Sequence, residues 1–241
     1  MSLVILHNET HQHLKVDTKP ATEYGDNINR ALAYSTEIAD LHKEFPLLIA
    51  KNPENGKLCA HAIMGLQKDE NLFLENGRWT CATVPATMAR GPFSIGYQEQ
   101  EVDGVKTQNP MIMVDEKDPR ISDSGTEVFL EFGGESPYLQ FVKKVLSVID
   151  SGHRNDEVFY ATLEEMELLE PVDINLSLSE QQHFGFKDYM SINQEKLSQL
   201  SGEQLVKLRD MGILAQVYFL LSSLGNFQRL IDKKNALQNA Q

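Results

Sequence analysis

The chain has 241 residues, of which 41% are hydrophobic, and its 35 acidic and 22 basic side chains give a formal net charge of −13. This acidity excludes broad binding to nucleic acid, because neutralising phosphates requires a surplus of Lys and Arg, and the lack of any apolar run of about 18 residues excludes a membrane-spanning helix. Two cysteines without a CxxC pair, and an N-terminus without the basic segment of a secretory signal, predict a reduced, cytoplasmic protein.

The first half of the chain carries the pattern of an antiparallel sheet. Residues 1–30 are polar and predict an extended arm or a short edge strand, and residues 31–44 predict a short helix or a winding segment that Pro46 ends. Two pairs, Asn55-Gly56 and Asn76-Gly77, favour tight turns and so predict two consecutive hairpins. The expected strands cover residues 47–50, 58–64, 71–75, 78–84 and 111–114.

The second half of the chain is expected to be mainly helical. Ser136-Pro137 is a good helix start, and Ser151-Gly152 is taken as the end of that helix. Ser201 begins a capping box, and Met211-Gly212 ends the helix that follows. The last helix is apolar nearly all round in its first half, which predicts a buried core helix. The expected helices cover 136–152, 155–170, 201–212 and 213–234, with strands at 172–178 and 183–192.

These elements define the predicted fold class as α+β, with an N-terminal antiparallel β meander of hairpins followed by a mainly helical C-terminal half. We expect one domain over residues 1–241, within which 1–135 is β-rich and 136–241 helix-rich.

Negative charge gathers in one segment. Residues 99–135 contain ten acidic and three basic side chains, a net charge of 3 − 10 = −7. Two interpretations stay open: a solvated acidic loop region, or an acidic face that meets a basic partner or a cation.

Four side chains that bind metals cluster near the N-terminus: His7, Glu9, His11 and His13. His7 and Glu9 have the H-x-E spacing of an iron site with two histidines and one carboxylate. Such a site needs a distal histidine, for which His153 and His183 are the candidates. The alternative is a group of polar surface histidines with no metal, and we predict no cofactor.

Cys59 and His61 alternate onto the same face of a predicted strand. They could form a thiolate–imidazole pair. Their apolar neighbours favour a buried, inert thiol and a packed histidine instead.

Trp79, Arg90 and Phe93 lie around the end of a predicted strand and the loop after it. Trp and Arg dominate binding hot spots, which makes these residues candidates for contact with a protein or peptide partner. The alternative is a core tryptophan beside a structural arginine.

Several short blocks follow one another along the chain: His13-Leu-Lys-Val16, Glu44-Phe-Pro46, Gly65-Leu66, Glu70-Asn-Leu-Phe73, Gly77-Arg-Trp79, Val84-Pro-Ala86, Arg90-Gly-Pro-Phe93, Leu168-Leu-Glu-Pro171, Gly185-Phe186 and Leu224-Gly-Asn-Phe-Gln-Arg-Leu230. In these blocks the chain resembles the SapC family of bacterial proteins. The resemblance covers nearly the whole chain. The family is named for a protein associated with a bacterial surface layer, and it has no accepted catalytic residues. Its gene neighbourhoods suggest an accessory role in peptide modification or TonB-dependent uptake, so the resemblance implies such a role for this chain.

Within the last block, Asn226 and Arg229 are three residues apart and so point the same way on a helix. They are expected either to make a tight intramolecular packing contact or to hold a carboxylate or a partner's backbone. The acidic segment 99–135 is one candidate for that carboxylate.

We therefore predict a cytoplasmic, non-catalytic binding or accessory protein of the SapC type, with a protein or peptide partner and binding candidates Trp79, Arg90, Phe93, Asn226 and Arg229. The alternatives are an iron-dependent, oxygenase-like enzyme and a surface-layer-associated structural protein. Neither nucleic-acid binding nor membrane insertion is expected, and oligomerisation is left open.

Overall fold

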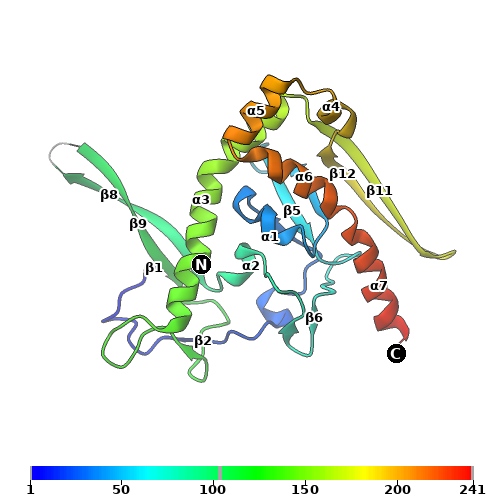
Figure 1. The fold of residues 1–241 in the computed structure, drawn as a ribbon. Helices are drawn as coiled ribbons and strands as arrows, with labels where there is room; N and C mark the ends of the chain where they lie inside the picture. Colours follow the sequence, from blue (N-terminus) through cyan, green and yellow to red (C-terminus); the bar gives the residue numbers. More distant parts are fainter. Residues whose placement is uncertain (1, 103–104, 240–241) are drawn as a thin grey trace. The chain divides into compact units, whose positions relative to one another are not determined.

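The structure is a computed structural model that describes residues 2–102 and 105–239. The chain divides into two compact units, each assembled from two separate segments (Figure 1). Unit 1 comprises Met1–Asp26 and Ala86–Asp150, and unit 2 comprises Asn27–Pro85 and Ser151–Gln241. The interpretation of residues 1–241 as a single domain stays a prediction.

Unit 1 is built on a long antiparallel ribbon. Its three-stranded sheet has the order β1-β9-β8, and β2 and β10 form a second, two-stranded sheet. The predicted strand at 111–114 is confirmed as the end of β9, whereas its partner β8 was expected to be a loop. The elements of unit 1 are β1 (Leu3–Ile5), β2 (Lys15–Val16), η1 (Thr22–Tyr24), α2 (Ala86–Ala89), β8 (Phe93–Val102), β9 (Val105–Asp115), β10 (Thr126–Glu127) and the first half of α3 (Pro137–Glu165).

Part of the acidic segment is neutralised within unit 1. Arg120 forms ion pairs with Asp26 at 3.1 Å and with Asp118 at 3.3 Å, and it also donates a hydrogen bond to the backbone oxygen of Tyr24 at 2.8 Å. Asp26 is almost completely buried. The arginine therefore offsets two carboxylates and ties the N-terminal segment to the loop after β9.

Unit 2 is built on a five-stranded antiparallel sheet with the order β11-β12-β4-β5-β3. The second half of α3 belongs to this unit. Its strands are β3 (Arg30–Ala33), β4 (Leu47–Lys51), β5 (Leu58–Ile63), β6 (Leu74–Glu75), β7 (Arg78–Trp79), β11 (Leu169–Ser179) and β12 (Gln182–Ile192), and its helices are η2 (Ser35–Glu37), α1 (Ile38–Leu41), α4 (Gln194–Ser198), α5 (Gly202–Asp210), α6 (Ile213–Ser223) and α7 (Asn226–Asn239).

Both predicted Asn-Gly hairpins are confirmed, but they do not form one continuous meander. The first pairs β4 with β5, with Ala50 opposite Cys59. The second, at Asn76-Gly77, has positive φ at both turn residues, and it joins only the two-residue strands β6 and β7 in a sheet of their own. The free edge of β4 is taken instead by β12, a long-range pairing that local turn signals do not encode.

The prediction that a helix ends at Gly152 is wrong, because α3 continues through this glycine to Glu165. A Cβ at Gly152 would lie 2.5 Å from Cβ and Cγ of the buried Tyr34 side chain. The glycine is therefore a point of close packing rather than a stop signal. The predicted start is confirmed, since the Ser136 hydroxyl accepts a hydrogen bond from the backbone N–H of Leu139 at 3.1 Å.

The C-terminal segment forms two helices where one was expected, since Leu224-Gly225 separates α6 from α7. The Ser201 capping box and the left-handed Gly212 are both confirmed. Helix α6 buries one face only, and Tyr218 on the other face is 53% exposed, so the prediction of a helix buried all round is wrong.

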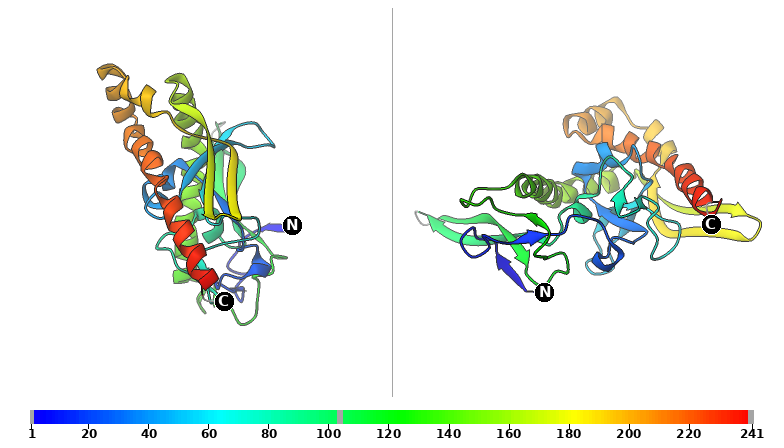
Figure 2. Two further views of the ribbon diagram at one scale, coloured as in Figure 1. Left: turned by 90° about the vertical axis from the view of Figure 1, so that its right-hand side faces the viewer. Right: turned by 90° about the horizontal axis from the view of Figure 1, so that it is seen from below.

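Helix α7 runs beside the β11–β12 hairpin (Figure 2), where the Phe186 and Phe227 rings lie 5.4 Å apart.

Antiparallel strands in the N-terminal half and helices in the C-terminal half confirm the predicted α+β class. Within the described part of the chain, no helix is both long enough and apolar enough to cross a membrane.

Candidate functional site

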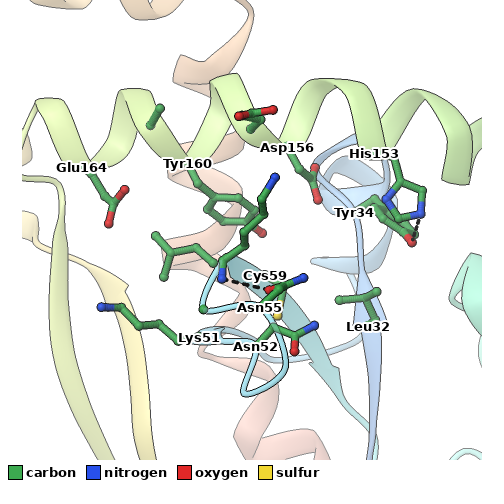
Figure 3. A pocket seen from close by; sticks show the side chains of 15 residues that line it. Leu32, Tyr34, Lys51, Asn52, Asn55, Cys59, His153, Asp156, Tyr160 and Glu164 are labelled. Carbon is green, nitrogen blue, oxygen red and sulfur yellow. Dashed lines mark hydrogen bonds between the residues drawn. The ribbon is translucent and has the colours of Figure 1, made fainter.

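Unit 2 contains a pocket of about 500 Å³ beneath the second half of α3. On the helix side it is lined by His153, Asp156 and Tyr160, and on the opposite side by Leu32 of β3 and Cys59 of β5 (Figure 3). The β4–β5 hairpin contributes a further set of mostly polar lining residues: Lys51, Asn52, Asn55, Gly56, Lys57 and Leu58. Pockets of a few hundred cubic ångströms are typical of small-molecule sites.

Helix and strand periodicity bring these side chains together. His153, Asp156 and Tyr160 are three and four residues apart, so they lie along one face of α3. On the sheet, Leu32 is opposite His61, and His61 is two residues from Cys59 on the same strand. The side chains of Leu32 and Cys59 therefore project from the same face of the sheet, towards the helix.

Tyr160, which lines this pocket, carries a buried polar atom without a hydrogen-bond partner in the described part of the chain. Its side chain is only 4% exposed, and its hydroxyl makes no hydrogen bond. The backbone of Ala60 lies close enough to influence the hydroxyl electrostatically but not in hydrogen-bonding geometry. Burial, with the nearby Asp156 and Cys59, raises the pKa of Tyr160 well above its usual value, so the hydroxyl is protonated.

Asp156 places a partly buried carboxylate one turn before Tyr160. It accepts a hydrogen bond from the backbone N–H of Ser35 at 2.9 Å, and the Ser35 hydroxyl is a second donor. Burial raises the pKa of Asp156 despite these two hydrogen bonds. The carboxylate therefore both holds the start of η2 and faces the pocket.

Cys59 and His61 share a strand face as predicted, but neither is activated. Burial and the neighbouring Asp156 raise the pKa of the Cys59 thiol, whose sulfur lies 3.6 Å from the Ala50 carbonyl oxygen. Burial lowers the pKa of His61 to about 4, and its ring packs edge-on against Tyr189. A protonated thiol beside a neutral imidazole is not a thiolate–imidazolium pair.

Tyr34 closes one end of the pocket. Its hydroxyl lies 3.0 Å from Nε2 of His153, and the two rings meet edge-on at 4.8 Å. The absent side chain of Gly152 leaves the space that Tyr34 occupies.

Asn226 and Arg229 bind the segment before β4. The Asn226 amide donates hydrogen bonds to the backbone oxygens of His42 at 2.7 Å and Phe45 at 3.2 Å. Arg229 pairs with Glu44 at 3.1 Å. These two residues thus hold a backbone and a carboxylate of their own chain, and the carboxylate is Glu44 rather than one from residues 99–135.

Trp79 belongs to one unit, and Arg90 and Phe93 belong to the other. Trp79 is half-buried in β7 of unit 2, opposite Leu74. Arg90 and Phe93 belong to unit 1, where the Arg90 guanidinium donates a hydrogen bond to the backbone oxygen of Phe93 at 2.6 Å, and the buried Phe93 ring faces Tyr138 at 6.1 Å. Their role in contacting a partner stays a prediction.

The N-terminal histidines are held by local hydrogen bonds. The His11 Nδ1 accepts from the backbone N–H of His7 at 3.0 Å, and its Nε2 lies 3.4 Å from a carboxylate oxygen of Glu116. His7 Nδ1 accepts from the backbone N–H of Glu9. Over residues 2–102 and 105–239, no three His, Cys, Asp or Glu side chains are arranged to hold a metal ion.

His13 is exposed, and His183, one of the two candidates for a distal ligand, is hydrogen-bonded to Ser177. The iron-dependent alternative stays an untested prediction.

The structure also identifies site residues that sequence analysis missed, namely Asp156, Tyr160 and Tyr34. Taking Gly152 as a helix end hid the signal, because the helical spacing of His153, Asp156 and Tyr160 becomes visible only when one helix spans all three.

The fold and the pocket define an α+β protein with a pocket that opens beneath one long helix. The SapC family model matches residues 6–230, so the chain belongs to the SapC family, as its sequence blocks predicted. Comparisons with curated proteins and with solved structures found no match.

Proposed function

We propose that this SapC-family protein is a non-catalytic binding protein and that the unit 2 pocket holds its ligand. The observation that carries this proposal is the buried, unpartnered hydroxyl of Tyr160, a residue that lines a pocket of about 500 Å³. Buried polar groups are almost always hydrogen-bonded, and leaving one unpaired costs about 1–3 kcal/mol. A ligand that reaches Tyr160 would remove this cost.

The protonation states in the pocket favour binding over catalysis. A nucleophilic cysteine needs a lowered pKa, whereas burial raises the pKa of Cys59. The Tyr160 hydroxyl is protonated at neutral pH, as an ordinary tyrosine is, and burial raises its pKa further. These groups are suited to donating and accepting hydrogen bonds to a ligand.

An accessory role towards a peptide or protein agrees with the size of this pocket. A volume of about 500 Å³ admits one or two peptide side chains or a small metabolite. The link to peptide modification or TonB-dependent uptake, which the family resemblance suggests, is part of this proposal, as is a cytoplasmic location.

The test compares Tyr160→Phe with Tyr218→Phe, in which the altered hydroxyl is on the exposed face of α6. A library of dipeptides and small fragments is screened against the ¹⁵N-labelled full chain by NMR. We expect ligands that shift the amide signals of Cys59 and Tyr160. Tyr160→Phe should weaken those that form hydrogen bonds, and Tyr218→Phe should not.

Tyr160→Phe should also stabilise the ligand-free protein by about 1 kcal/mol, because it removes an unsatisfied buried hydroxyl. Such an opposite effect on stability and affinity is not expected of a merely structural tyrosine. Screening hits that all map outside the pocket would contradict the proposed site. Conversion of a bound compound, detected by mass spectrometry and lost in Cys59→Ala or Tyr160→Phe, would contradict the non-catalytic proposal.

A further inference from the structure

We propose that the ligand of the unit 2 pocket carries a primary ammonium group, which pairs with the carboxylate of Asp156 and donates a hydrogen bond to the hydroxyl of Tyr160. This inference rests on the proposed function and specifies the chemical class of the ligand.

The first observation is that Asp156 has only neutral donors. Its hydrogen bonds come from the backbone N–H and the hydroxyl of Ser35. Within residues 2–102 and 105–239, no Lys or Arg forms an ion pair with it. The nearby His153 lowers the pKa of Asp156 less than burial raises it, so the partly buried carboxylate keeps a net desolvation cost. A cationic ligand would supply the missing charge.

The second observation is that Asp156 and Tyr160 lie one turn apart on the face of α3 that lines the pocket. Side chains at this spacing have Cβ atoms about 5–6 Å apart. An ammonium group has three N–H donors, so a single group can bond to more than one acceptor. Figure 3 shows both side chains projecting from α3 towards the sheet.

The other charges around the pocket do not reverse this preference. Two lysines, Lys51 and Lys57, belong to the β4–β5 hairpin and are exposed. Three carboxylates face them from α3, those of Asp156, Glu157 and Glu164. An anionic ligand group beside Tyr160 would be repelled by the Asp156 carboxylate, because no lysine among the described residues is paired with that carboxylate.

Apolar surface is available for the rest of the ligand. Leu32, Leu58 and Ala161 line the pocket together with the rings of Tyr34 and Tyr160. Aromatic faces also attract cations. The structure therefore favours an apolar body that ends in an ammonium group.

The test uses three probes with one apolar body and different head groups: phenylbutylamine, phenylbutanol and phenylbutyrate. Each is titrated into the ¹⁵N-labelled full chain, and binding is followed from the amide signals of Cys59 and Tyr160. We expect the amine to bind about tenfold more tightly than the alcohol, since an ion pair with a partly buried carboxylate adds to a hydrogen bond. The carboxylate probe should bind most weakly.

Asp156→Asn should reduce the affinity for the amine to that for the alcohol and leave the alcohol unaffected. The substitution keeps an oxygen to accept from Ser35, and circular dichroism checks that the fold is intact. Asp173→Asn is the matched control, because Asp173 is exposed on β11 and does not line the pocket. Tyr160→Phe is a second variant, expected to weaken the amine about threefold to tenfold through the lost hydrogen bond.

Two further probes distinguish the source of the ammonium group. Nα-acetyl-lysine amide offers only a side-chain amine, and phenylalanine amide offers only an N-terminal amine. Preferential binding of either, lost in Asp156→Asn, supports the inference and identifies a lysine or an N-terminus as the natural group. If Asp156→Asn weakens the binding of neither probe, while the binding of phenylbutylamine still depends on Asp156, the result supports a small-molecule amine.

Tightest binding of phenylbutyrate would overturn the inference and assign the pocket to an anion held by Lys51 and Lys57. Equal binding of all three head groups would overturn it as well, because the apolar body alone would then drive binding. If none of the probes binds while the wider library yields pocket ligands of another chemistry, the ammonium inference fails and the proposed function stands. If nothing binds in the pocket at all, both fail.

Discussion

Gly152→Ala should destabilise the protein, although the same change at an ordinary position inside a helix would stabilise it. Alanine is favoured over glycine in a helix interior by about 1 kcal/mol. At position 152, however, the new methyl group would lie 2.5 Å from Cβ and Cγ of Tyr34 and 2.7 Å from its Cδ1. These atoms belong to the stem and ring of a buried side chain, which has little freedom to move away.

The expected size follows from these two opposing effects. Overpacking a well-filled interior costs about 1–3 kcal/mol. The upper part of that range applies, because the contact involves three atoms of a tyrosine that also bonds to His153. Subtracting the gain in helix propensity leaves a net loss of about 1–2 kcal/mol, which corresponds to a fall in melting temperature of about 2–8 °C for a chain of this size.

The assay is urea unfolding of wild type and Gly152→Ala, followed by circular dichroism. Gly202→Ala is the control, since a Cβ at Gly202 meets nothing within 4 Å, and it should leave the stability unchanged or raise it. If Gly152→Ala were as stable as the wild type or more so, the packing of Tyr34 against α3 would be wrong, and with it the end of the pocket that Tyr34 closes.

Three further predictions concern buried charges and thiols of unit 2. Burial lowers the pKa of His61 from 6.5 to about 4, so the unfolded chain binds more protons between these pH values. The contribution of neutral His61 to stability is therefore full above pH 6.5 and is lost as the pH falls towards 4. Relative to His61→Gln, the wild type should lose up to about 3 kcal/mol of unfolding free energy between neutral pH and about pH 4, and a stability difference that stays constant with pH would contradict this. Glu44 and Arg229 should show a coupling free energy of about 1 kcal/mol in a double-mutant cycle of Glu44→Gln and Arg229→Met, measured by urea unfolding. Glu44 is held in place for this ion pair because it also accepts backbone N–H groups. Strictly additive effects of the two substitutions on stability would rule the pairing out. Cys81, whose pKa burial raises to about 11, and Cys59 should react with iodoacetamide more slowly in the folded than in the unfolded protein, and rapid labelling of the folded protein would contradict their protonated state.

Local signals in the sequence predicted the elements that local chemistry decides. The Asn55-Gly56 turn, the capping box at Ser201 and the left-handed Gly212 appear where the sequence placed them. The order of strands could not be predicted in the same way, because β12 pairs with β4 across more than a hundred residues and no local feature of Leu47–Lys51 specifies that partner.

Two glycines show why local signals also mislead. Gly152 resembled a helix end, but tertiary contact with Tyr34 decides its role. Gly225 falls inside the helix expected at 213–234, but it lies where α6 stops and α7 starts. A glycine permits several backbone conformations and several packing distances, so its meaning depends on distant residues.

Three of the blocks that identified the family supply packing contacts within unit 2 rather than residues that line the pocket. Glu44 pairs with Arg229, whose guanidinium lies 5.7 Å from the centre of the Phe73 ring. Phe45 packs against Phe73, and the centres of the two rings lie 4.5 Å apart. These residues come from three different blocks and meet in one contact network. The recognisable sequence therefore records how the chain packs, which is why it pointed to Asn226 and Arg229 and away from Asp156 and Tyr160.

The most direct test of the account is the NMR titration of phenylbutylamine into wild type and Asp156→Asn. We expect a saturable shift of the Cys59 and Tyr160 amide signals in the wild type and an affinity lower by about tenfold in the variant. Identical binding to both proteins, or shifts confined to residues outside the pocket, would contradict it.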